Sequence, residues 1–271
     1  MNIDNWLDFI PLWGVFALTV VLVLLAIGVG FFTGRSRREQ DPEVSVGSVV
    51  GATLGLLAFL LAFTFGASAS RYDMRKQLLL DEVNSIETTY LRADLLPEAR
   101  SNEVRKLLRE YVDLREQLAR EPERLSQIIM RSDVLHKELW AEAIASAKEG
   151  SNAAFVGRFI DSLNSMIDLQ TKRLTVGLQY RIPGAIWLAL CFVAALSMAA
   201  MGYQFGLSNT SNYHIHILVA LTFSIVIFLI VDLDRAREGM LQVNQQPMTE
   251  LQQRLETPPP ESTPIKSVLG P

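Results

Sequence analysis

Four long runs of apolar residues dominate this sequence and restrict the folds that are open to it. None of the runs contains Asp, Glu, Lys or Arg, and only the last contains histidine. A helix needs roughly 20 apolar residues to cross the hydrocarbon core of a bilayer, which the first three runs provide and the fourth nearly reaches. The sequence therefore predicts an all-α membrane protein with four transmembrane helices, at 12–32, 44–66, 182–205 and 214–231.

The four predicted spans divide the chain into four regions. Residues 1–67 form a first transmembrane hairpin, and 182–233 form a second one. A charged helical insert at 68–181 separates the hairpins, and 234–271 is a tail. The stretch TPPPESTP, which begins at Thr257, has four prolines in eight residues, so we expect disorder after about residue 256.

The insert has the amphipathic spacing of helices nearly throughout. Breaks occur at Pro97, at Glu121-Pro122 and at Gly150, which predicts four helices, the first of them continuous with the second span. We interpret the helices as a bundle or coiled-coil extension of the membrane helices, because amphipathic faces bury against one another. A specific ligand-binding role for the insert is the alternative.

Lys and Arg near the span ends indicate the side of the membrane on which each loop lies, because cytoplasmic flanks hold an excess of them. With the insert in the cytoplasm, eight such flanking residues lie inside and three lie outside. The three are Arg35, Arg37 and Arg38, a compact cluster in a short loop that favours the opposite orientation. The larger tally predicts that the insert and both termini are cytoplasmic.

The sequence lacks the motifs of enzymes and of cofactor sites, with no nucleophile elbow, phosphate-binding loop, dinucleotide fingerprint or HExxH. Three histidines cannot fill a tetrahedral zinc site alone, and His214 and His216 fit interfacial anchors better than metal ligands. A net charge of -4 without a basic stripe argues against nucleic acid. We expect no enzyme, no metal and no cofactor.

The second span carries small and aromatic residues at four-residue spacing: Gly47, Gly51, Gly55, Phe59, Phe63, Ala67 and Arg71. Small residues at this spacing let helices approach closely, so the glycines predict helix packing. A pore is the second interpretation, because in an oligomer Phe59 and Phe63 would form stacked apolar rings able to gate by dewetting. Arg71 and Arg75 would then attract anions at the inner mouth.

Charged residues crowd the end of the fourth span, in the sequence VDLDRAREG from Val231 to Gly239. Two interpretations stay open. The charges form a stop that fixes the helix end among the lipid headgroups, or Asp232 or Asp234 pairs with an arginine of the insert.

Two segments of the chain resemble a known family. They are LLAFLLAFTFGASASRYDMRKQLLLDEVNSIETTYLRADLLPE at 56–98 and VDLDRAREGMLQVNQQPM at 231–248, which together are similar to the bacterial bestrophin-like domain proteins, a family of unknown function. Ala236 departs from the proline that follows the arginine in that family. The other specific positions of the second segment are Asp232, Asp234, Arg235 and Gly239.

The resemblance implies a function. Bestrophins are pentameric anion channels with four membrane helices, a cytoplasmic helical region and aromatic gating residues on the second membrane helix. By this resemblance we expect an oligomeric anion channel of a bacterial inner membrane, whose partners are the lipid bilayer, anions and further copies of itself. The alternative is a non-conducting membrane scaffold or sensor whose cytoplasmic bundle binds another protein, an interpretation favoured by the amphipathic insert.

The predicted orientation can be tested with reporter fusions. Because the excess of Lys and Arg favours a cytoplasmic insert, a reporter near Pro122 or after Leu255 should behave as cytoplasmic, and one at Gln40 as external. Alkaline phosphatase works only outside the cytoplasm, so an active fusion at Pro122 would contradict this orientation.

Overall fold

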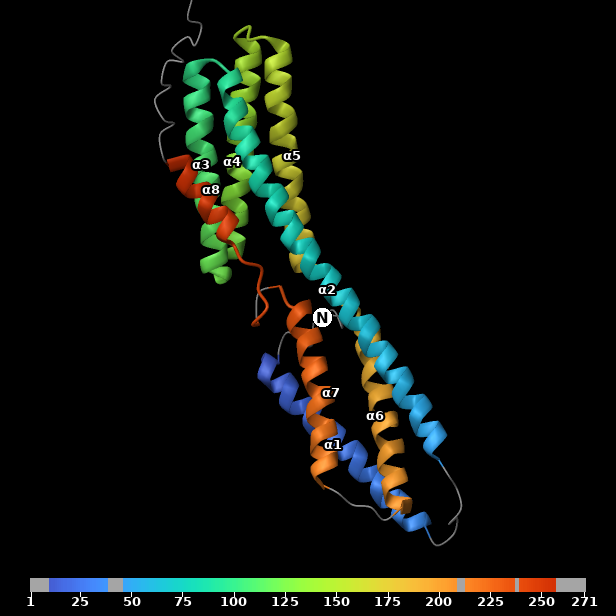
Figure 1. The fold of residues 1–271 in the computed structure, drawn as a ribbon. Coiled ribbons are helices and arrows are strands. Elements are labelled where there is room, and N and C mark those ends of the chain that lie inside the picture. Colours follow the sequence, from blue (N-terminus) through green and yellow to red (C-terminus); the bar gives the residue numbers. More distant parts are fainter. Residues whose placement is uncertain (1–9, 39–45, 209–212, 237–238, 257–271) are drawn as a thin grey trace, which may run out of the picture. The chain divides into compact units, whose positions relative to one another are not determined.

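The computed structural model describes residues 10–38, 46–208, 213–236 and 239–256, and these residues form helices and no strand. The expectation of an all-α protein is confirmed. The predicted disorder after residue 256 falls outside the described residues. The helices of the described chain (Figure 1) are α1 Leu12–Arg37, α2 Gly47–Arg92, η2 Ala93–Leu95, α3 Glu98–Arg120, η3 Pro122–Arg124, α4 Leu125–Lys148, α5 Ala153–Leu178, α6 Gly184–Ser208, α7 Tyr213–Asp234 and α8 Gln246–Glu256.

Four helices of the described chain, α1, α2, α6 and α7, are long and apolar enough to cross a membrane, as the sequence predicted. Helix α2 continues beyond its apolar part as one helix to Arg92. Long apolar helices are the form in which a single segment can satisfy all its backbone hydrogen bonds away from water. The four-span fold class is therefore confirmed.

The chain divides into two compact units. The membrane unit comprises Met1–Arg75 and Val176–Val243, and the bundle unit comprises Lys76–Thr175 and Asn244–Pro271. Helix α2 contributes residues to both units. The bundle unit includes α8 from the tail, where the sequence did not predict a helix.

Two pairs of glycines join α1 and α6 in the membrane unit. A Cβ atom added at Gly30 or Gly34 would overlap the backbone oxygen of Ala199 or Tyr203 on α6. A Cβ added at Gly202 or Gly206 of α6 would likewise overlap backbone oxygens of α1. Both pairs have the four-residue spacing that lets membrane helices approach closely. The closest intrachain packing thus uses these glycines and not those of α2.

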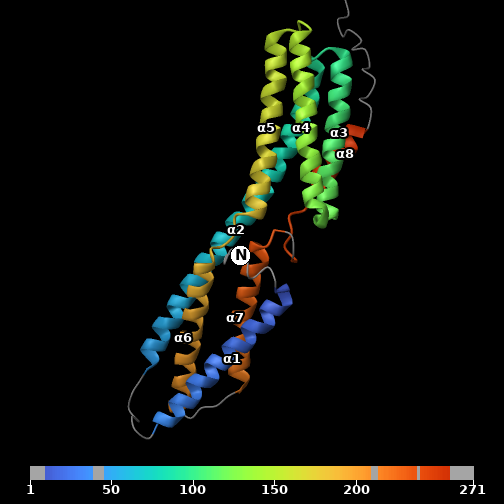
Figure 2. The same ribbon diagram turned by 180° about the vertical axis from the view of Figure 1, so that it is seen from behind.

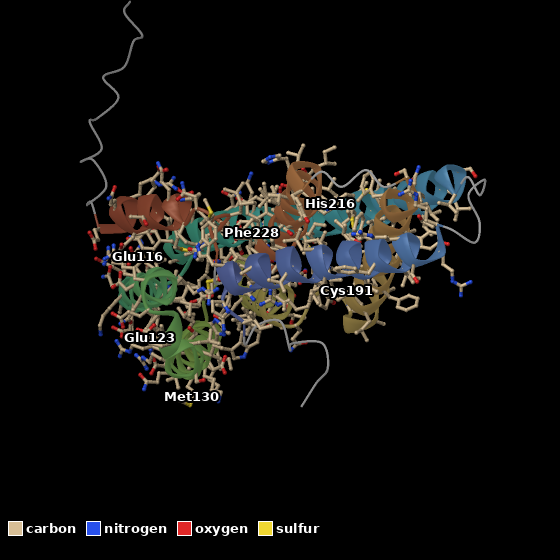
Figure 3. All side chains as sticks on the ribbon, turned by 90° about the horizontal axis from the view of Figure 1, so that it is seen from below. Glu116, Glu123, Met130, Cys191, His216 and Phe228 are labelled. Atoms are coloured by element: carbon tan, nitrogen blue, oxygen red, sulfur yellow. The ribbon has the colours of Figure 1, made fainter. Side chains whose placement is uncertain are left out.

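Other contacts in the membrane unit come from aromatic rings and one hydroxyl. The ring of Phe228 on α7 (labelled in Figure 3) lies 5.3 Å from that of Trp13 and 6.0 Å from that of Phe16, both on α1. The buried hydroxyl of Ser197 on α6 donates a hydrogen bond to the Thr53 carbonyl oxygen of α2, at 3.1 Å. Helices α1 and α6 therefore each contact a further membrane helix.

The bundle unit packs apolar side chains between α3, α4, α5 and its part of α2, which lie side by side in Figures 1 and 2. Its helices end where the sequence breaks occur. Pro97 directly precedes α3, and Gly150 adopts a positive φ of 82° just after α4. The side chain of Asn152 then accepts a hydrogen bond from the Ala154 amide at the start of α5. Fully buried residues of the core include Leu108, Leu135, Leu139, Phe159 and Leu163.

Helix α8 packs on α3 through one apolar face. Met248, Leu251 and Leu255 are buried, at the spacing of one side of a helix. The Arg109 Nε atom donates a hydrogen bond to the Leu255 carbonyl oxygen at 2.9 Å, and the Gln252 amide donates one to Asp113 at 2.8 Å. The tail segment is thus an integral part of the bundle unit.

The α1–α6 contact predicts different effects for two neighbouring glycines. Gly30→Ala should lower the melting temperature of the detergent-solubilised protein, because overpacking costs about 1–3 kcal/mol. Gly28→Ala is the matched control on the same helix, since an added Cβ there meets nothing within 4 Å. Equal melting temperatures for the two variants would contradict the role of Gly30.

Candidate functional site

Helix α2 presents one face to the rest of its unit and leaves another uncovered. Val50, Leu57 and Leu61 are buried in the apolar core, with Leu57 at 0% exposure. Phe59 and Phe63 are 67% and 64% exposed. Because a helix turns once in about 3.6 residues, these phenylalanines lie on the side roughly opposite the buried one. Both rings are therefore largely uncovered by the described part of the chain.

Two of the three glycines singled out on α2, Gly51 and Gly55, share this lack of cover. A Cβ added at Gly51 or Gly55 would have no neighbouring atom within 4 Å, and Gly47 is half-buried. Gly51 and Gly55 thus form no close helix contact within the described part of the chain. Their predicted role in helix packing therefore requires a surface outside the chain and stays a prediction.

Four-residue spacing does not keep residues on one face over many turns. Each step of four advances slightly more than a full turn, so the row winds around the helix from Gly47 to Arg71. Arg71 and Arg75 accordingly lie on the side of α2 that meets α7, away from Phe59 and Phe63. Their predicted place at the mouth of a pore stays a prediction.

Both arginines contact the C-terminal end of α7. The Arg71 Nη1 atom lies 3.2 Å from the Asp234 Oδ1 atom, in a salt bridge whose carboxylate is 10% exposed. Arg75 donates a hydrogen bond to the Leu233 carbonyl oxygen at 2.5 Å. Of the two interpretations of the charged helix end, pairing of an aspartate with an arginine is therefore observed.

A third arginine and a backbone amide complete the surroundings of Asp234. Arg181 donates to the Asp234 carbonyl oxygen, and the Ile182 amide lies 3.2 Å from the Asp234 Oδ1 atom. Both residues directly precede α6. Asp234 thus joins α2, α7 and the segment that leads into α6. Sequence patterns do not reveal the part played by Ile182, because any residue except proline could supply this amide.

Asp232 organises the chain just after α7. Its carboxylate accepts hydrogen bonds from the Met240 and Leu241 amides, at 2.8 and 3.2 Å. Gly239 has a φ of 120°, which favours glycine, and a Cβ at this position would overlap the Asp232 carboxylate. Backbone conformation and space both therefore require glycine here. Arg235 reaches the Ile10 carbonyl oxygen at 2.6 Å, before α1. Asp232, Asp234, Arg235 and Gly239, which carried the resemblance, all act at this helix end.

The sequence matches the bestrophin-like domain over residues 15–248. The chain belongs to the bestrophin-like domain family. No curated protein matches the sequence.

Solved structures show the same fold. A crystal structure of a bacterial bestrophin homolog from Klebsiella pneumoniae, with one mutation, is 14% identical, has a TM-score of 0.69, and matches over 89% of this chain and 97% of its own. A second crystal structure of the Klebsiella pneumoniae homolog is also 14% identical, with a TM-score of 0.67. The match covers 88% of this chain and 96% of the homolog. The protein is a membrane protein of the bestrophin kind.

The Asp234 pairing predicts a measurable loss of stability. Asp234→Asn should destabilise the protein by about 1–3 kcal/mol, because Arg71 loses its charged partner in a largely buried place. Asp73→Asn, an exposed change on α2, should shift stability by less than about 0.5 kcal/mol. Thermal unfolding in detergent measures both, and an unchanged Asp234→Asn variant would contradict the assignment.

Proposed function

We propose that the protein forms a homo-oligomeric anion channel in which α2 lines the pore. The observation that carries this proposal is the uncovered face of α2, with Gly51, Gly55, Phe59 and Phe63, opposite the face that packs on its own chain. Bestrophins are channels rather than enzymes, and the bestrophin-like domain of this chain supports a channel by its similarity to them.

The open glycines support association of several copies. Small residues allow close approach of membrane helices, and no residue of the described chain lies against Gly51 or Gly55. The glycines joining α1 to α6 are already used within the chain. Those of α2 are therefore available for a neighbouring copy.

The two phenylalanines support a gate. They lie one helical turn apart and are similarly exposed, so copies arranged around an axis would place two stacked apolar rings along it. A narrow apolar ring excludes water, and an ion must shed hydration to pass it. The proposed barrier to conduction is this dry segment of α2.

The charges at the end of α7 support anions as the permeant species. Arg71, Arg75, Arg181 and Arg235 lie there with the carboxylates of Asp232 and Asp234, four positive against two negative charges among the described residues. A local excess of positive charge raises the concentration of nearby anions. The proposal places this helix end, the insert and both termini in the cytoplasm of a bacterial inner membrane.

One observation favours the alternative, a non-conducting scaffold or sensor. Met130, Val134 and Ile144 form an exposed apolar row on α4 in the bundle unit, and Figure 3 shows Met130 on its outer side. Such a row is suited to a protein partner. Loss of the channel proposal would make this function the preferred one.

Oligomeric state and flux test the channel. The protein in nanodiscs should be an oligomer, and a strict monomer would end the proposal. In liposomes, Phe63→Ser should raise the anion flux, because a polar side chain lowers the free-energy barrier that the apolar ring presents to an ion. Each ~1.4 kcal/mol removed from this barrier corresponds to an increase in flux of about tenfold.

Phe65→Ser is the matched control for this flux measurement. Phe65 is also exposed, at 41%, but it lies on a different face of α2. Its replacement should therefore change flux less than that of Phe63. Equal impermeability of the folded, oligomeric wild type and both variants would leave the scaffold as the preferred function.

A further inference from the structure

The bundle unit encloses a polar cluster within its apolar core. Glu82 of α2 is fully buried, and it accepts a hydrogen bond from the Tyr111 hydroxyl of α3 at 3.0 Å. The Arg115 Nε atom of α3 lies 3.1 Å from the Glu82 carboxylate, and Arg173 of α5 pairs with the same carboxylate. The Tyr111 hydroxyl also contacts the Gln170 side chain of α5 at 2.8 Å. Three helices thus meet at one buried carboxylate.

The charges that pair directly at Glu82 do not balance. Glu82 supplies one negative charge, whereas Arg115 and Arg173 supply two positive ones. The Arg115 side chain is 2% exposed, so water screens its charge little. Its Nη1 atom is buried without a hydrogen-bond partner in the described part of the chain. A buried guanidinium with an unused donor is costly unless something completes its hydrogen bonds.

Helix α4 brings two further unpartnered groups to the same core. Ser132 is fully buried and His136 is 8% exposed, one helical turn apart on α4. The Ser132 Oγ and His136 Nε2 atoms are both buried and meet no hydrogen-bond partner among the described residues. The His136 ring lies 5.4 Å from the Tyr111 ring, and Tyr111 is one turn from Arg115 on α3. The ring contact therefore joins the two helices that carry the unpartnered groups.

We propose that this core binds a small inorganic anion of halide size, held by Arg115, Ser132 and His136. A guanidinium N–H, a hydroxyl and an imidazole N–H are all donors, and donors beside an excess positive charge select an anion over a cation. Burial on all sides restricts the ligand to a single small ion. The anion offsets the second arginine and completes the hydrogen bonds that the protein leaves open.

Binding is coupled to the protonation of His136. Burial lowers the pKa of His136, with Arg115 acting in the same direction and Asp133 of α4 and Glu82 of α2 opposing it. Tyr111 and Arg173 are the other titratable groups of the cluster, and burial raises the pKa of Tyr111. Without an anion, stability is full above the unfolded pKa of about 6.5 and is lost as the pH falls toward the lowered folded pKa. An anion favours the charged imidazole, so the anion binds more tightly as the pH falls.

Bromide diffraction locates the ion directly. Crystals of the full-length protein in bromide should show an anomalous peak in contact with Arg115, Ser132 and His136. Absence of that peak, with only water at the position, would overturn the proposal.

Melting temperatures test the site in solution. Chloride should raise the melting temperature of the full-length protein by about 2–4 °C over gluconate of equal ionic strength at about pH 7.5, and by more at about pH 5.5. Ser132→Ala should remove at least half of the chloride effect. Ser146→Ala is the matched control, because Ser146 is equally buried on α4 but already donates to the Glu142 carbonyl oxygen at 2.9 Å.

The two serine variants separate this core from any other anion site of the protein. A chloride effect that is the same in Ser132→Ala, Ser146→Ala and the wild type would overturn the proposal, because a site elsewhere would then account for it. Loss of the effect in Ser132→Ala alone supports the assignment.

Discussion

The carbonyl groups at the C-terminal end of α7 constrain how several parts of the membrane unit meet. The last four carbonyls of a helix have no partner within it, and near a membrane they need donors from the protein. Arg75 supplies one to Leu233, and Arg181 supplies one to Asp234. Both cations also suit the negative end of the helix dipole. The side chain of Asp234 then binds Arg71. Satisfying one helix end in this way determines how α2 and the start of α6 meet α7.

Hydropathy predicted the fold class because a bilayer imposes a length and a composition on every helix that crosses it. The breaks at Pro97 and Gly150 also coincide with helix ends, because proline fixes its own φ and lacks a backbone N–H, whereas glycine readily adopts the positive φ seen at Gly150. Helix α8 was not predicted from the sequence, because it is short and has only three buried apolar residues. Its stability comes from contact with α3, which a local pattern does not show. Local patterns therefore reveal structure that is determined locally or by the solvent.

The residues of the candidate sites could not be predicted as well as the fold, because their roles depend on which helix surfaces meet. The spacing of residues along the sequence does not determine which surfaces meet. Gly51 and Gly30 both belong to rows of small residues at four-residue spacing, yet among the described helices Gly30 touches a neighbour and Gly51 does not. Glu82 reads as part of a solvated face, because charged residues on amphipathic helices usually lie outside; instead it is fully buried between two arginines. The sequence predicted pairing of an aspartate with an arginine of the insert only as one of two alternatives, and it singled out Arg71 for the mouth of a pore, not for this salt bridge. Helix α2 carries residues of both the uncovered phenylalanine face and the buried polar cluster.

The glycine contact between α1 and α6 has a consequence for how this sequence can change over generations. Every other amino acid has a side-chain carbon, so any missense change at Gly30, Gly34, Gly202 or Gly206 inserts an atom where backbone already lies. Exposed positions of the membrane helices such as Leu25 and Leu188, at 60% and 61% exposure, can exchange among apolar residues with little effect on the packing within the chain. Sequence changes in the membrane unit are therefore expected mainly at its exposed positions. The glycine contact between α1 and α6 can change only if the two helices also move apart.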